Sequence, residues 1–147
     1  MKHLLKSLLI TMVLATGPVI AQQAQQFGDY VVHYNALNTS LLTPEVAKAY
    51  GIRRSNSRAL INISVLQSVD DLPAAAVKAE VTASGRNLTG QIRNIAMREI
   101  NDGGGAIYYI GELPVRNMET FSFTVTVLPE GRDRPVKVTF RQQFYTE

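Results

Sequence analysis

The feature that most constrains the fold of this chain is a repeated alternation of apolar and polar residues. In the clearest run, Phe or Val occupies the odd positions from 121 to 127, and Ser or Thr separates them. Successive side chains of a strand point to opposite faces, so a period of two indicates a half-buried β-strand. Shorter strands of similar character are expected at 30–34, 59–66, 77–83 and 136–140. The sequence therefore predicts an all-β domain.

Turn residues separate these strands and predict how they pair. A Pro- and Gly-containing loop, 129–135, joins the 121–127 run to 136–140 and favours an antiparallel hairpin. Gln142 falls in the inward register there, which indicates either an edge strand or a bulge. Gly-containing turns at 84–87 and 102–105 would bound one strand at 88–100 and begin another at 106–112.

One short helix is expected after the first strand. Thr43 can cap it, Pro44 suits its first position and Gly51 can end it. About seven strands with short turns and one helix predict an immunoglobulin-like antiparallel β-sandwich. A small barrel is the alternative.

The N-terminus has the pattern of a cleaved signal peptide over residues 1–21. Lys2 and Lys6 precede an apolar stretch, and Ala21 is a suitable residue for cleavage. The uncharged run is short for a membrane span, which needs about 20 residues, so no stable membrane insertion is expected after cleavage. Residues 22–27 are expected to be a flexible lead-in, and 28–147 a single domain.

Composition excludes several function classes. The chain has no cysteine, which rules out disulfides, thiol catalysis and cysteine-ligated metals. Two of the 15 Lys and Arg lie in the leader, which leaves 13 against 12 Asp and Glu, a net charge of +1. A nucleic-acid-binding domain carries a clear basic excess, so no nucleic-acid partner is expected.

Several segments together resemble a family of exported bacterial proteins known as domain of unknown function 4426. They are Phe27-Gly28-Asp29-Tyr30, 32–35, 42–47 with 50–52, 98–100, 107–112 and 143–145. The resemblance covers essentially the whole chain after the leader. It implies a small periplasmic β-domain of a Gram-negative cell, and it brings no activity, ligand or residue role.

His33 is the only histidine after the leader. It could be a general base or a metal ligand, or a hydrogen-bonded structural group of its strand. A serine hydrolase would need His33 as its base, and the chain has no Gly-x-Ser-x-Gly motif. We expect no catalytic residue, no metal site and no cofactor.

The irregular crossover from His33 to Arg58 is the candidate binding surface. Arg53, Arg54 and Arg58 form the densest basic cluster and could face an anion. Asn35, Asn38 and Tyr50 lie in the same segment and could bind a partner. The alternative is that Asn35, Thr39 and Ser40 merely satisfy backbone groups through an irregular crossover.

These observations predict a non-catalytic periplasmic interaction module that binds a protein or envelope component. Binding would use the crossover or an exposed strand edge. One alternative is a small-ligand or metal carrier that uses His33, and the other is a hydrolase centred on His33.

Overall fold

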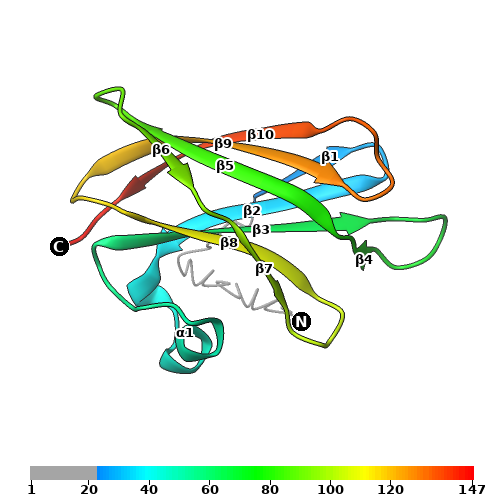
Figure 1. Cartoon of the computed structure of the whole chain (residues 1–147), viewed down its shortest axis with the longest axis horizontal. Coiled ribbons are helices and arrows are strands. Elements are labelled where there is room, and N and C mark those ends of the chain that lie inside the picture. The colour runs from blue at the N-terminus through cyan, green and yellow to red at the C-terminus, as the bar shows by residue number, and fades with distance from the viewer. Residues whose placement is uncertain (1–22) are drawn as a thin grey trace, which may run out of the picture.

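The computed structural model describes residues 23–147, which form two antiparallel β-sheets with one α-helix (Figure 1). The strands of the first sheet, in spatial order, are β1 (Gln23–Phe27), β2 (Tyr30–Asn38), β3 (Arg58–Gln67), β8 (Ile107–Pro114) and β7 (Arg98–Asn101), with β4 (Ala75–Ala76) also paired to β3. Those of the second sheet are β10 (Val136–Phe144), β9 (Glu119–Pro129), β5 (Ala79–Asn87) and β6 (Ile92–Ile95). A 3-10 turn η1 (Thr39–Leu41) and the helix α1 (Pro44–Tyr50) connect β2 to β3.

Each sheet has an apolar face, and these two apolar faces pack against each other, so the core is a layer between the sheets. The largest fully buried side chains are Phe121, Phe123, Phe144, Ile61, Ile63, Leu113, Val32, Val65, Val125, Val127, Val138 and Thr39. Except for Leu113 and Thr39, these residues occupy alternate positions of β2, β3, β9 and β10. The alternation that predicted a half-buried β-domain is confirmed.

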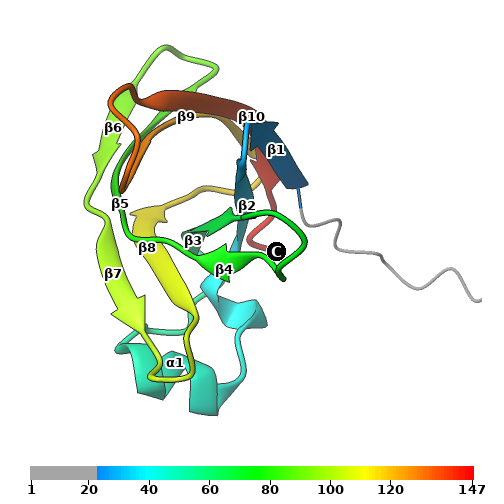
Figure 2. The same ribbon diagram turned by 90° about the vertical axis from the view of Figure 1, so that its right-hand side faces the viewer.

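The two sheets meet along both of their long sides (Figure 2). On one side the Tyr34 and Phe140 rings, from β2 and β10, lie with their centroids 4.8 Å apart. On the other side β6 belongs to the second sheet and β7, which follows it directly, belongs to the first. The chain therefore crosses between the layers at residues 96 and 97.

The first sheet is also covered on part of its outer face. Ala47 of α1 and Ile52 after it pack with Leu60 and Ile110, which lie on β3 and β8. The predicted helix start and stop are confirmed, because the Thr43 side chain accepts a hydrogen bond from the Val46 amide and Gly51 adopts φ 66°. Strand β3 is buried on both faces at this end.

Three expectations about the elements are wrong. Residues 23–27 are not a flexible lead-in, because they form β1 and pair with β2 along their full length. The described residues contain ten strands rather than about seven. The expected strand at 88–100 is two strands, β6 and β7, which lie in different sheets.

The expected turn at 84–87 is also wrong, because these residues continue β5. Gly85 faces the core, where a Cβ atom would lie 3.0 Å from the Phe123 ring. The absence of a side chain at position 85 therefore allows the Phe123 ring to pack closely against this strand. The turn comes later, at Gly90, which has φ 86°. The β9–β10 hairpin is confirmed, and β10 is an edge strand whose register runs without a bulge past Gln142.

Candidate functional site

Four polar side chains form a compact block on the outer face of the first sheet. His33 pairs with Ser64, and Asn35 pairs with Asn62, in the β2–β3 ladder. Residues two apart on a strand share a face, so these two pairs lie in adjacent rows. All four side chains are half-buried.

The block forms part of the lining of a hollow at a fork in the sheet. Strand β8 pairs with β3 only as far as Ile63, and β4 takes the same side of β3 from Leu66. Between these points lies a hollow of about 280 Å³. Its lining consists of the polar block together with Tyr34, Leu66, Ala76, Ala106, Ile107 and Tyr108.

One group in the hollow lacks a hydrogen-bond partner. The Oδ1 atom of Asn62 is buried, and in residues 23–147 it has no partner. Nearly all buried polar atoms of folded proteins are hydrogen-bonded, because losing water without a replacement costs about 1–3 kcal/mol. Asn62 is also one of the residues that line the hollow.

The chemistry of the lining is that of a neutral polar site. It offers an imidazole, two carboxamides, a serine hydroxyl and the side chain of Tyr108, and it includes no Asp, Glu, Lys or Arg. Ser64 lies beside His33, but no carboxylate among the lining residues could orient that imidazole. No group of three His, Cys, Asp or Glu that could hold a metal occurs within the described range.

The structure separates the seven predicted binding residues. His33 and Asn35 line the hollow. Asn38 lies at the far end of β2, where its Nδ2 atom donates to the carbonyls of Asn56 and Tyr145 at 2.8 and 3.0 Å. Asn38 therefore ties the crossover to the C-terminal segment.

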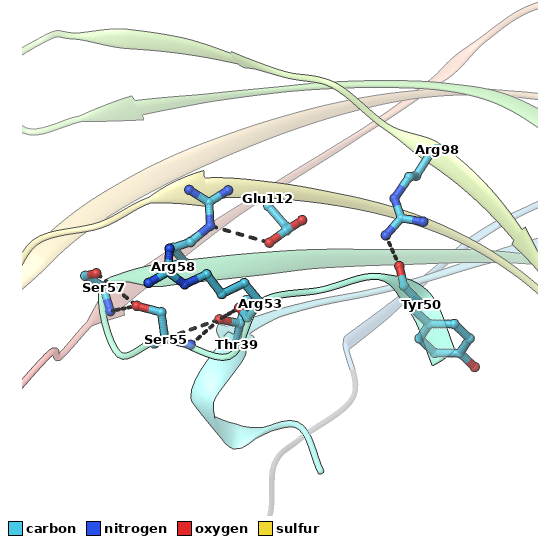
Figure 3. A network of polar contacts seen from close by, with 8 residues as sticks. All are labelled: Thr39, Tyr50, Arg53, Ser55, Ser57, Arg58, Arg98 and Glu112. Carbon is cyan, nitrogen blue, oxygen red and sulfur yellow. Dashed lines mark hydrogen bonds and ion pairs between the residues drawn. The ribbon is translucent and has the colours of Figure 1, made fainter. Parts of the chain in front are cut away.

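Two of the three residues of the predicted anion patch, Arg54 and Arg58, make internal contacts through their side chains. Figure 3 shows Arg58 with Glu112, and Arg53. Arg54 donates to the carbonyls of Leu42 and Ser40, at 2.8 and 3.1 Å. Arg58 forms an ion pair with Glu112 at 3.5 Å. Arg53 is exposed, and its carbonyl accepts the hydroxyl of the fully buried Thr39.

Tyr50 belongs to the packing of the helix rather than to the hollow. Its side chain is half-buried against the small cluster that α1 forms with the first sheet. Its carbonyl accepts a hydrogen bond from Arg98 of β7, which Figure 3 shows reaching across to it. This contact ties the end of α1 to β7.

Sequence reasoning missed Asn62, Ser64 and Tyr108. The alternation of β3 does place Asn62 and Ser64 on the face opposite Ile61 and Ile63, so a polar pair on that face was readable. Their pairing with Asn35 and His33 depends on the register between β2 and β3, which no local pattern specifies. Tyr108 joins them because β8 diverges from β3 at that level.

A second polar group lies at the core side of β8. The Tyr109 hydroxyl accepts the Ala79 amide at 2.8 Å and donates to Glu99 Oε1 at 3.1 Å. Burial raises the pKa of the Tyr109 hydroxyl above its usual range, and the neighbouring Glu99 carboxylate raises it further. The hydrogen bond from the Ala79 amide lowers this pKa but does not cancel the rise. This group links β5, β7 and β8.

Among residues 23–147, no helix has the length and apolar character to span a bilayer. The expected signal peptide and its cleavage after Ala21 lie outside the described residues.

Comparison with known proteins identifies the family. The profile of a domain of unknown function, DUF4426, matches residues 24–147. A crystal structure of a DUF4426 family protein from Pseudomonas aeruginosa PAO1 is 34% identical, with a TM-score of 0.72, and the match covers 86% of this chain and 96% of that one. No curated protein matches the chain. The chain belongs to the DUF4426 family of domains of unknown function.

Proposed function

We propose that this chain is a non-catalytic binding module of the bacterial periplasm, and that its ligand site is the hollow beside His33. The observation that carries the proposal is the buried, unpartnered Oδ1 atom of Asn62 within a block of polar side chains. A ligand that supplies an N–H or O–H group would satisfy this oxygen and replace the water that folding removed.

The lining defines the chemical class of the ligand. A volume of about 280 Å³ is slightly below the range of about 300–1,000 Å³ typical of ligand pockets, so the ligand is small. The absence of a charged residue from the lining favours a neutral, polar group with both donors and acceptors. The ligand is therefore either a free small molecule or an envelope component whose polar end enters the hollow.

Two further predictions rest on the sequence. The periplasmic location follows from the leader at 1–21, and the immunoglobulin-like connectivity remains a prediction beyond the two observed sheets. A protein partner at the crossover is less favoured than the hollow, because Arg54 and Arg58 are engaged within the chain.

The test is a thermal-shift screen of neutral amino acids, sugars and soluble peptidoglycan fragments against the purified protein. A ligand at a hundred times its Kd would stabilise the fold by about 2.7 kcal/mol. Asn62→Leu should abolish the shift but leave the stability of the free protein unchanged or higher, because it removes an unsatisfied buried polar group. Asn56→Ala, an exposed residue away from the hollow, is the control.

Two results would contradict the proposal. One is a ligand whose shift survives both Asn62→Leu and His33→Ala, since it would bind elsewhere. The other is a screen in which no compound stabilises the protein while Asn62→Leu destabilises it by more than about 1 kcal/mol, which would show that the carboxamide serves the fold. Hydrolysis of any screened compound that is lost in His33→Ala would instead support the hydrolase alternative.

A further inference from the structure

The outer face of the second sheet carries a three-by-three grid of polar side chains. We call it the hydroxyl–cation face, and it consists of Thr82, Ser84, Arg86, Ser122, Thr124, Thr126, Lys137, Thr139 and Arg141. Three neighbouring strands, β5, β9 and β10, each contribute three residues at alternate positions. Their intervening residues face the core, so the nine side chains share the opposite face.

The register aligns these residues into straight rows across the sheet. Thr82 pairs with Thr126, which pairs with Lys137. The next row is Ser84, Thr124 and Thr139, and the third is Arg86, Ser122 and Arg141. Strands lie about 4.8 Å apart and same-face residues about 6.7 Å apart along a strand, so the grid is a regular polar lattice.

None of the nine side chains is engaged within the part of the chain described here. The six hydroxyls and the three cations make no hydrogen bond to residues 23–147, and the ion pair found there, Arg58 with Glu112, lies on the other sheet. Arg86, Ser122, Lys137, Thr139 and Arg141 are exposed. Ser122, Thr124, Thr139 and Arg141 also line a shallow hollow of about 290 Å³.

The charges of this face are not what folding alone requires. Threonine is common on strands because its branched side chain suits a pleated surface, so the hydroxyls could serve the sheet. Cations on a sheet are stabilised when an acidic residue lies opposite, but no acidic residue occupies the grid; the acidic residue that borders it on β5 is Glu80, two residues before Thr82. The grid therefore carries three positive charges, although the chain after its leader has a net charge of +1.

We propose that the hydroxyl–cation face binds an acidic glycan, a polysaccharide that carries carboxylate or phosphate groups. Arg86, Lys137 and Arg141 would bind the anionic groups, and the serine and threonine hydroxyls would exchange hydrogen bonds with the sugar hydroxyls. A flat, repeating lattice suits an extended polymer. The site lies on the opposite layer from the hollow beside His33 and is independent of it.

A lipid bilayer is the less favoured occupant. Binding at a bilayer surface through apolar burial needs large apolar side chains, and the grid contains none. Two exposed apolar side chains lie at the border of the grid: Ile92, which pairs with Arg86, and Leu88, just past the end of β5. The test therefore includes vesicles as a separate arm.

The experiment measures binding of the purified protein to polygalacturonate, to neutral dextran, and to vesicles of phosphatidylglycerol and phosphatidylcholine. We expect binding to polygalacturonate but not to dextran, with an affinity that falls as salt rises because counterions are released. The variant Arg86→Ser/Lys137→Ser/Arg141→Ser should lose at least tenfold in affinity. Thr124→Val/Thr139→Val, which keeps shape and charge, should lose severalfold.

The matched control removes the same charge from other surfaces. Lys48, Arg53 and Arg116 are exposed, so Lys48→Ser/Arg53→Ser/Arg116→Ser has the same net charge as the triple variant of the grid. It should bind polygalacturonate within about twofold of the native protein. Unfolding temperatures of all variants confirm that each one is folded.

Three outcomes would overturn the proposal. The first is equal loss of affinity in both triple variants, which would show that net charge alone drives binding. The second is the absence of binding to polygalacturonate at low salt. The third is binding to the anionic vesicles that exceeds binding to polygalacturonate and depends on the grid, which would assign the face to a membrane.

Discussion

Tyr109 shows how a single hydroxyl can join three strands. It lies on β8, accepts the amide of Ala79 on β5 and donates to Glu99 on β7. The side chain is only 5% exposed, so its ionised form would lose most of its hydration. The protonated tyrosine is therefore the form that this part of the fold requires.

This raised pKa predicts a loss of stability in alkali. Below about pH 10 the tyrosine is neutral in both the folded and the unfolded chain, and its contribution is fully present. As the pH rises above that value the unfolded chain releases this proton first, so the free energy of unfolding falls until the folded pKa is passed. Chemical denaturation between pH 8 and pH 12 should show a steeper decline for the native protein than for Tyr109→Phe.

The Tyr109→Phe variant also tests the hydrogen bond of the hydroxyl at neutral pH, where tyrosine is not ionised. It leaves the Ala79 amide without its partner, so it should be less stable by about 1 kcal/mol at pH 7. Identical slopes of stability against pH in the two proteins would show that Tyr109 does not titrate differently in the fold.

At the scale of elements, the helix and the hairpins were predictable and the chain crossing was not. Thr43, Pro44 and Gly51 are local signals, and α1 begins and ends where they indicate. Residues 88–100 form β6 and β7 in two different sheets, because the chain leaves one layer at Ala96 and enters the other. Nothing in the local alternation reports which sheet a strand joins, since that depends on contacts with β5 and β8.

The cap of α1 can be tested directly. Thr43→Ala removes the hydrogen bond from the Val46 amide and should lower the free energy of unfolding by about 1 kcal/mol. Ser40→Ala, on the same crossover, is the control, because no hydrogen bond to the Ser40 hydroxyl is present in the described chain and its stability should change little. Equal effects in urea denaturation would mean that the cap contributes nothing specific.

At the scale of the whole molecule, sequence reasoning identified a mainly β domain but only part of its candidate site. The alternation in β3, β9 and β10 assigns the inner and outer faces correctly. His33 and Asn35 were predicted as binding residues and do line the hollow, whereas the side chains of Asn38 and Arg54 bind carbonyls of the crossover and Arg58 pairs with Glu112 of β8. The hollow itself lies between the part of β3 that pairs with β8 and the part that pairs with β4. This gap is a property of the assembled sheet.

The joint between the two layers depends on Gly111. A Cβ atom at this position would lie 2.5 Å from Met97 Sδ, 2.6 Å from Ile95 Cγ2 and 2.9 Å from the Ala96 carbonyl oxygen. Gly111→Ala should therefore push the crossing segment away and destabilise the protein by about 1–3 kcal/mol or more, as overpacking does. Gly104→Ala, in the exposed turn between β7 and β8, should have a much smaller effect on the urea midpoint.

Because one continuous stretch of backbone is the border strand of one layer and then of the other, the molecule has no independent halves. Strands β6 and β7 are joined by only two residues, so separating either one from its sheet displaces the other. It also exposes Ile95 and Met97, which pack in or against the core at this point. A form that keeps one sheet while the other melts would have to expose this shared seam to water. Unfolding should accordingly be a single all-or-none event, with the same midpoint whichever sheet a probe reports on.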